Sequence, residues 1–270
     1  MRELQLLRNL YQPFHPVRTE RNRLVSYNEF MPDRSLQPFI FHYWEMKTSG
    51  PGQGAFLHKV IPNGCVDVYF NVTRPDESFI TGLSDKHSSV NVPAECRYIG
   101  ICFAPTVAPQ LYRFNGIELH NRHERLEDLA LSTASFIKSA LTPDLSSHQV
   151  KSLLDKHFQT ELSKADFKCD RRLLSALHNI FTSNGNVRIE SDLDVGLSPR
   201  QLRRVFDTYI GDSPKSFSRT VRFQRYLQAN LSSHRADNQF YDFGYYDQVH
   251  FIKEFKRLYG TTPSHVTSYQ

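Results

Sequence analysis

A repeat with an offset of 49 residues near the C-terminus limits what this chain can fold into more than any other feature. Each copy consists of a helix-capping residue, a phenylalanine, a glycine and a proline: Ser198, Phe206, Gly211 and Pro214 in the first, and Asp247, Phe255, Gly260 and Pro263 in the second. Serine and aspartate accept hydrogen bonds from the unpaired N–H groups at a helix start. Glycine can adopt the left-handed conformation that ends a helix, and proline suits the first turn of the next one. The repeat therefore predicts two equivalent helices, each followed closely by another helix.

Each of these two helices separates an apolar face from a basic one. The apolar positions recur at helical spacing: Leu202, Phe206 and Tyr209, and Phe251, Phe255 and Leu258. The opposite faces carry cationic, imidazole and amide side chains: Arg200, Gln201, Arg203 and Arg204, and Gln248, His250, Lys253 and Lys256. A short turn containing Gly196 or Gly244 precedes each helix. This arrangement is typical of a helix-turn-helix recognition helix, and two copies in register disfavour the competing interpretation of a solvated charged face.

The excess positive charge of the chain is confined to the same region. The last hundred residues hold 14 lysines and arginines against nine acidic residues, which accounts for the whole net charge of +5. The first 170 residues are balanced, with 19 basic and 19 acidic side chains. Such asymmetry indicates a polyanion-binding module joined to a neutral one.

Two stretches of this region resemble the AraC/XylS family of bacterial transcription regulators. They are VGLSPRQLRRVFDTYIGDSPKSF at 195–217 and FGYYDQVHFIKEFKRLYGTTPSHV at 243–266, within a resemblance that covers about residues 170–270. It implies an all-α module in which two helix-turn-helix units are joined by a long helix at about 214–231. A helix of that length spans roughly 27 Å, so two recognition helices at its ends could enter successive major grooves about 34 Å apart.

The resemblance also implies which side chains contact DNA. Together with the basic faces described above, the predicted set is Arg200, Gln201, Arg203, Arg204, Gln248, Val249, His250, Lys253 and Lys256. Arginine can bind guanine in a bidentate manner, glutamine can pair with adenine, and valine can contact a thymine methyl group. Arg219, Arg222 and Arg225, on the connecting helix, are expected to be phosphate contacts or solvated. The implied partners are double-stranded promoter DNA and RNA polymerase.

The helix that should brace each recognition helix departs from the family pattern. Where the family usually has Leu-Ala, the first unit has Ser191-Asp192 and the second has Phe240 in place of the alanine. A small alanine allows close packing, so either the bracing helices lie further apart here or their local register is shifted.

The residues before this module predict a mixed α+β protein. Strand-like runs at 39–46, 65–72 and 98–103 are rich in β-branched and aromatic residues, which favours a small β-barrel or cupin-like domain. A helix follows at 145–164, and it either packs within one chain or pairs with a second copy. The expected domains are a β-rich effector or dimerisation domain at 1–135, a helical linker at 136–168 and the DNA-binding domain at 169–270.

Aromatic residues of the β-rich part could line a pocket for a small-molecule effector. The candidates are Tyr43, Trp44, His58, Tyr69 and Phe103, with ordinary core packing as the competing interpretation. Residues 30–130 also resemble a poorly characterised domain found with such DNA-binding modules. His120-x-x-His123 has a metal-ligand spacing, but surface histidines are the favoured interpretation.

The sequence as a whole favours a sequence-specific transcription regulator, expected to be an activator, that is not an enzyme and needs no cofactor. A cupin-like metal enzyme fused to a DNA-binding module and a non-specific nucleic-acid adaptor are the alternatives. No membrane partner is expected, because no apolar run reaches the length of a transmembrane helix and no secretory signal is evident. Four cysteines without paired spacing favour free thiols in a reducing compartment, so the protein is expected in the cytoplasm. There it would associate with the nucleoid, either alone or as a homodimer.

Overall fold

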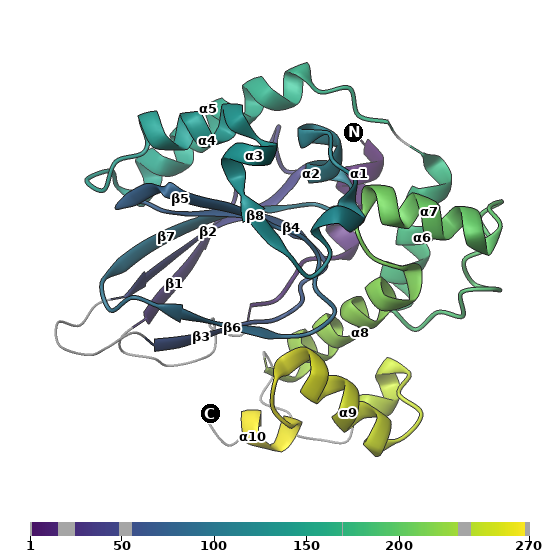
Figure 1. Ribbon diagram of the computed structural model, residues 1–270. Helices are drawn as coiled ribbons and strands as arrows, with labels where there is room; N and C mark the ends of the chain where they lie inside the picture. The colour runs from purple at the N-terminus through teal and green to yellow at the C-terminus, as the bar shows by residue number, and fades with distance from the viewer. Residues whose placement is uncertain (1, 16–24, 49–55, 169, 232–238, 268–270) are drawn as a thin grey trace.

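The N-terminal half is organised around an open antiparallel sheet (Figure 1). The computed structural model describes residues 2–15, 25–48, 56–168, 170–231 and 239–267. Six strands pair in the order β1 (Val25–Phe30), β2 (Ile40–Thr48), β7 (Cys96–Phe103), β4 (Val66–Asn71), β5 (Arg74–Thr81) and β8 (His123–Arg125). A separate two-stranded ribbon consists of β3 (Phe56–Val60) and β6 (Ser88–Val92). The three predicted strands are confirmed as β2, β4 and β7, and among the described residues no pairing closes the sheet into a barrel.

Helices cover one face of the six-stranded sheet, and the β3–β6 ribbon lies on the other side (Figure 1). The helical layer consists of α2 (Val107–Tyr112), the 3₁₀ helix η2 (Gly116–Leu119), α3 (Leu126–Leu129), α4 (Leu131–Ala140) and α5 (Ser147–Lys164). In α5, Phe158 is fully buried and packs edge-on against Phe103, with ring centroids 5.5 Å apart. The helix predicted at 145–164 therefore buries its apolar stripe within its own chain. We call the two sheets and these helices the sheet domain.

The C-terminal region is entirely helical where it is described, which confirms the predicted α+β class. It consists of α6 (Arg171–Thr182), α7 (Pro199–Tyr209), α8 (Pro214–Leu231), the 3₁₀ helix η3 (Gln239–Phe243), α9 (Gln248–Tyr259) and α10 (Pro263–Thr267). The repeat is confirmed in atomic detail. Ser198 and Asp247 accept backbone hydrogen bonds at the starts of α7 and α9, and Gly211 and Gly260 both have a φ of 90° at their ends.

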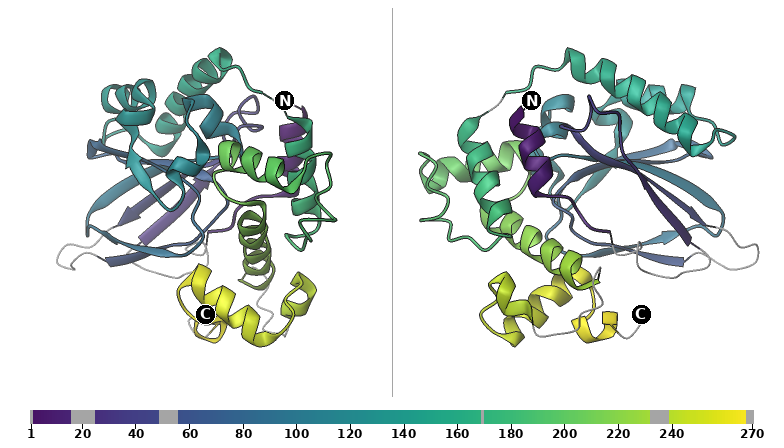
Figure 2. Two further views of the ribbon diagram at one scale, coloured as in Figure 1. Left: turned by 45° about the vertical axis from the view of Figure 1, so that its right-hand side comes forward. Right: turned by 180° about the vertical axis from the view of Figure 1, so that it is seen from behind.

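Two large hydrophobic cores join the N-terminal half to the helical region, and a third, small cluster contains Met46, Val92 and Cys96. The larger core runs from Leu4 through the sheet domain to α6, α7 and the first half of α8. The smaller core joins the second half of α8 to α9 and also contains Phe14 and Ile61 from the N-terminal half. The first helix, α1 (Arg2–Leu10), lies against α6 (Figure 2), and Tyr11 stacks on Phe181 with ring centroids 4.7 Å apart. The sequence pattern did not predict α1.

The cysteines of the described residues are free thiols, as the sequence predicted. Cys65, Cys96 and Cys102 are buried free thiols, and Cys169 lies outside the described residues. The domain boundaries at residues 135 and 168 stay a prediction. In the described part of the chain, no helix combines the length and apolar character needed to cross a bilayer.

Candidate DNA interface and ligand cavity

The first basic face lies on the exposed side of α7. Arg200, Gln201, Arg203 and Arg204 are all exposed, whereas Leu202 and Phe206 on the opposite side are buried. Arg203 Nε donates to Asp207 Oδ1 at 2.9 Å, an exposed pair within one helix. The side-chain oxygen of Gln201 accepts from the backbone N–H of Ser198 at 2.9 Å and completes a capping box. Gln201 therefore helps to start the helix, while the three arginines extend from its surface.

The second basic face occupies the matching side of α9. Its predicted contact residues are all exposed: Gln248, Val249, His250, Lys253 and Lys256. Val249 is 76% exposed, so its methyl groups are presented to solvent in the first turn of the helix. The buried side carries Phe251, Phe255 and Leu258. Both predicted faces thus exist as exposed surfaces.

A buried ion pair fixes α9 to the connecting helix α8. Arg222 Nη2 donates to both carboxylate oxygens of Glu254, at 2.8 and 3.0 Å, and its guanidinium lies 4.3 Å from the centre of the Tyr245 ring. Arg222 is only 11% exposed. Arg225 is half-buried, donates to the Leu10 carbonyl and lies over the Tyr11 ring. Acceptors on other elements hold both guanidinium groups, so the expectation of solvated side chains is wrong for both, and a phosphate contact stays a prediction.

The bracing segments are not α-helices, which explains their unusual residues. In the first unit, residues 189–193 form turns, and the Asp192 carboxylate accepts from the backbone N–H of Arg188 at 2.7 Å. That hydrogen bond lowers the pKa of Asp192, which is exposed, while Leu193 beside it is buried. In the second unit, Phe240 belongs to η3 and stacks on Phe251 with centroids 5.2 Å apart. Asp192 stabilises a turn and Phe240 fills the core, so neither occupies an alanine-sized contact between two α-helices.

The sheet domain contacts the C-terminal end of each recognition helix. At α7, a Cβ placed on Gly211 would come within 2.6 Å of the Gly116 carbonyl oxygen, and His120 Nδ1 lies 2.9 Å from the Gly211 oxygen. At α9, the backbone N–H of His87 donates to the Arg257 carbonyl at 3.0 Å, and Arg257 pairs with Asp85. The sheet domain therefore contacts both recognition helices without covering their basic faces.

A glutamine on α8 also links the N-terminal half to the second helix-turn-helix unit. Gln224 is buried, its Oε1 accepts from the backbone N–H of Phe14 at 2.7 Å, and its Nε2 donates to the Pro62 carbonyl at 2.7 Å. Phe14 and Ile61, next to these two bonds, belong to the second core. One side chain thus satisfies two backbone groups of the N-terminal half.

Replacing Gln224 with leucine should lower the free energy of unfolding by on the order of 2 kcal/mol, because two buried backbone groups lose their partners. Urea unfolding of the full chain measures this. Gln228→Leu is the matched control, since Gln228 lies one turn later and is exposed; we expect a change within about 0.5 kcal/mol. Equal effects of the two substitutions would contradict a role for the buried hydrogen bonds.

A cavity of about 250 Å³ lies between the six-stranded sheet and the β3–β6 ribbon. Three of the five predicted effector-binding residues line it: Trp44, His58 and Tyr69. Tyr43 and Phe103 do not, because alternate residues of a strand face opposite sides of the sheet. They pack instead under α5, where the Tyr43 hydroxyl donates to Asp155 at 3.1 Å. Burial lowers the pKa of His58 to about 4, so its imidazole is neutral at neutral pH.

Gly100 shapes the floor of this cavity. It pairs with Trp44 on one side and Tyr69 on the other, so the two large rings flank a residue without a side chain. The Trp44 indole lies over Gly100, and the Trp44 and Tyr69 ring centroids are 6.5 Å apart. The glycine therefore lets an aromatic surface form across three adjacent strands.

The substitution Gly100→Ala should displace the Trp44 ring, since the added Cβ would lie 2.0 Å from its Cε2 atom. We expect a loss of about 1–3 kcal/mol in the free energy of unfolding, the usual effect of overpacking. Trp44 is the one tryptophan of the chain, so its fluorescence reports the displacement directly. Unchanged emission together with an unchanged urea midpoint would contradict this role for Gly100.

Asp67 is the acidic residue of the cavity, and the sequence interpretation missed it. Its Oδ1 accepts from Trp44 Nε1 at 3.2 Å and its Oδ2 from Asn63 Nδ2 at 2.9 Å. Burial raises the pKa of this carboxyl group. The signal was present in the run CVDVYFNV, because strand alternation places Asp67 on the same face as Tyr69.

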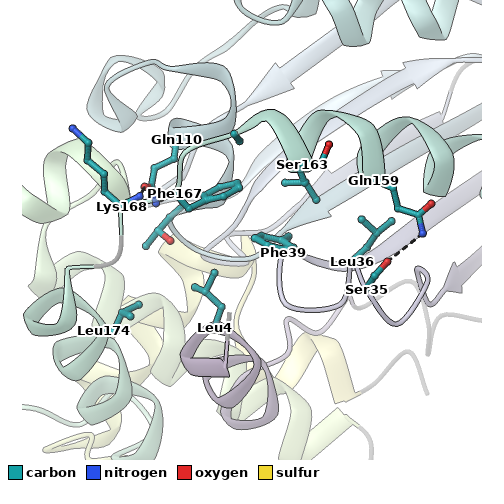
Figure 3. Close-up of a pocket in the computed structure, with 13 residues that line it drawn as sticks. Leu4, Ser35, Leu36, Phe39, Gln110, Gln159, Ser163, Phe167, Lys168 and Leu174 are labelled. Carbon is teal, nitrogen blue, oxygen red and sulfur yellow. Dashed lines mark hydrogen bonds between the residues drawn. The ribbon is translucent and has the colours of Figure 1, made fainter.

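A second cavity, of about 430 Å³, lies where α1, the end of α5 and the start of α6 meet (Figure 3). Its lining is mainly apolar and includes Leu4, Phe39 and Phe167, and Gln159 Nε2 donates to Ser35 Oγ at 3.1 Å across one edge. None of the predicted effector-binding residues lines it.

The two histidines with metal-ligand spacing have separate surroundings. His120 lies beside the Gly211 carbonyl, and His123 packs edge-on against Phe79. In the described residues, no group of three or more His, Cys, Asp and Glu side chains is arranged to hold a metal ion.

Comparison with known protein families agrees with the helical arrangement. Residues 194–268 match a family described as a helix-turn-helix domain, and residues 28–125 match one described as a domain of unknown function (DUF6597). None of the curated proteins matches the chain. An apo variant of ToxT from Vibrio cholerae is 12% identical, with a TM-score of 0.42 over 93% of this chain and 99% of that one. A 1.65 Å structure of ToxT is 9% identical, with a TM-score of 0.43 over 92% and 99%.

The paired helix-turn-helix units with exposed basic helices define a DNA-binding transcription regulator. Its C-terminal module is an AraC-type helix-turn-helix domain, which confirms the resemblance found in the sequence.

Proposed function

We propose that this protein is a sequence-specific regulator that reads two successive major-groove segments, one with α7 and one with α9. The observation that carries this proposal is the pair of exposed basic faces at the two ends of one helix. That helix, α8, has 18 residues and so spans roughly 27 Å. The spacing is compatible with major grooves that recur about every 34 Å along one side of DNA.

The proposed contacts divide between the two helices. Arg200, Arg203 and Arg204 read guanines or bind phosphates from α7, with Gln201 beside them. From α9, Gln248 pairs with adenine and Val249 contacts a thymine methyl group, while His250, Lys253 and Lys256 bind nearby phosphates or base edges. All nine side chains are exposed on the two helices, which supports these proposed DNA contacts.

The resemblance to AraC/XylS regulators supports an activator that works with RNA polymerase at a promoter. Because its ligand would be chromosomal DNA, the protein would act in the cytoplasm, on the nucleoid. The sheet domain would serve as the sensor for a small molecule. This sensory role is supported by the cavity of the sheet domain, which shares Phe14 and Ile61 with the core of the second helix-turn-helix unit.

Selection of bound fragments from genomic DNA, with and without cell extract, tests this function. We expect enrichment of a motif with two conserved segments about one helical turn apart, and a change in occupancy when extract supplies the effector. A steep salt dependence without any enriched motif would instead identify a non-specific nucleic-acid binder.

A further inference from the structure

The cavity under the β3–β6 ribbon has an unusual chemical lining. Rings from five strands of the larger sheet face it: Tyr27, Trp44, Tyr69, Phe79 and Tyr98. They form a nearly continuous row, with successive centroid distances of 6.3 Å from Tyr27 to Trp44, 6.5 Å from Trp44 to Tyr69 and 5.6 Å from Tyr69 to Phe79. One face of Trp44 covers Gly100, so its other face is left for the cavity.

The acidic group of this cavity is Asp67, whose ionised form would make the site negative. Asp67 lines the cavity, and none of the described lining residues is a lysine or an arginine. The partners of Asp67 in the described part of the chain are neutral: it accepts hydrogen bonds from Trp44 and Asn63, and the Cys102 thiol is a further neighbour. A carboxylate held in a poorly solvated site favours a cation and repels an anion.

Aromatic faces and a carboxylate attract the same kind of ligand. The negative face of an aromatic ring attracts ammonium groups, and aromatic cages recognise quaternary ammonium compounds in this way. We propose that the cavity binds a small organic cation, an amine or quaternary ammonium compound, with its charged group between Asp67 and the faces of Trp44 and Tyr69. This inference rests on the proposed sensory function and names its ligand class.

Such a ligand would be well placed to affect the second helix-turn-helix unit. Phe14 and Ile61 form part of the cavity wall and also pack in the core that holds α9. Gln224 of α8 binds the backbone at Phe14 and Pro62. Movement of this wall on binding would therefore be transmitted to α8 and α9 through a buried contact.

Fluorescence of Trp44 in the full chain tests the proposal with three probes of similar shape at constant ionic strength. These are choline, its neutral carbon analogue 3,3-dimethylbutan-1-ol, and the anion 3,3-dimethylbutanoate. We expect a saturable change with choline at millimolar Kd or below, at least about ten-fold weaker binding of the alcohol, and no saturable change with the anion. Equal binding of choline and the alcohol, preference for the anion, or no saturation by choline would overturn the proposal.

Substitutions test whether Asp67 and Tyr69 cause the preference for choline over the neutral alcohol. Asp67→Asn should remove the preference for choline over the alcohol, whereas Asp76→Asn, which removes an exposed carboxylate elsewhere on the sheet domain, should retain it. Because Asp67 also accepts hydrogen bonds from its neighbours, Tyr69→Leu provides a second test that leaves the carboxylate in place, and it should weaken choline binding more than alcohol binding. Retained preference in both Asp67→Asn and Tyr69→Leu would overturn the assignment.

The proposed DNA-binding function is measured separately. If choline fails to bind while a selected DNA motif is still bound, the ligand class is refuted and the regulator function stands. If choline binds but no motif is selected, the sequence-specific function fails and the cation site stands.

Discussion

Replacing both Arg203 and Lys253 with alanine is expected to abolish specific promoter binding while leaving the fold intact. Each side chain is exposed near the middle of its recognition helix, and neither contributes to a hydrophobic core. Among the described residues, Arg203 pairs with Asp207 on its own helix, an exposed interaction worth less than about 1 kcal/mol. A good base contact contributes about 1–3 kcal/mol, so losing one from each helix should weaken specific binding by roughly 30-fold or more.

Electrophoretic mobility shifts with the selected motif measure this loss at physiological salt. The charge-matched control replaces Arg125 and Lys138, two exposed cations of the sheet domain that pair with Glu127 and Asp76. The control variant should bind within a few-fold of the original protein, because its charges lie away from α7 and α9. Unchanged affinity of the Arg203 and Lys253 variant would refute the assignment of the two reading faces.

The elements that sequence predicted well are those whose signals are local. A cap, an apolar stripe and a terminal glycine lie within about a dozen residues of one another, so the repeat located α7, α8 and α9 with their ends. Asp192 and Phe240 were recognised as atypical, but their actual roles depend on backbone geometry. A turn stabilised by a carboxylate and a 3₁₀ helix leave no periodic pattern to detect.

The features that sequence did not predict depend on contacts between distant segments. The sequence does not distinguish Gln224 from other helical amides, because its hydrogen-bond partners at Phe14 and Pro62 lie more than 150 residues away. The cavity was predicted in part, because aromatic content identified Trp44 and Tyr69. Strand alternation in the sequence already separates Tyr43 from Trp44 and groups Asp67 with Tyr69, but only the strand register shows that Trp44 and Tyr69 flank Gly100.

Removing the carboxylate of Glu254 should produce the largest loss of stability in the second helix-turn-helix unit. Glu254 is buried against Arg222, which is itself 11% exposed and lies over the Tyr245 ring. Glu254→Ala would leave a buried guanidinium without its main counter-charge, and breaking a buried pair in this way costs about 3–5 kcal/mol. Arg219, whose Nε lies 3.6 Å from the same carboxylate, would lose a counter-charge as well.

Urea unfolding followed by far-ultraviolet circular dichroism measures the effect, with Asp207→Ala as the control. Asp207 also pairs with an arginine, but within α7 and at the surface, so its loss should cost about 0.5 kcal/mol. Because the carboxylate joins α9 to α8, Glu254→Ala should also remove protection of one half of the selected DNA site in a footprint, while the half bound by α7 stays protected. Loss of protection in both halves together would show that the two units fold and bind as one. A loss of unfolding free energy equal to that of Asp207→Ala would show that the buried pair does not hold α9 in place.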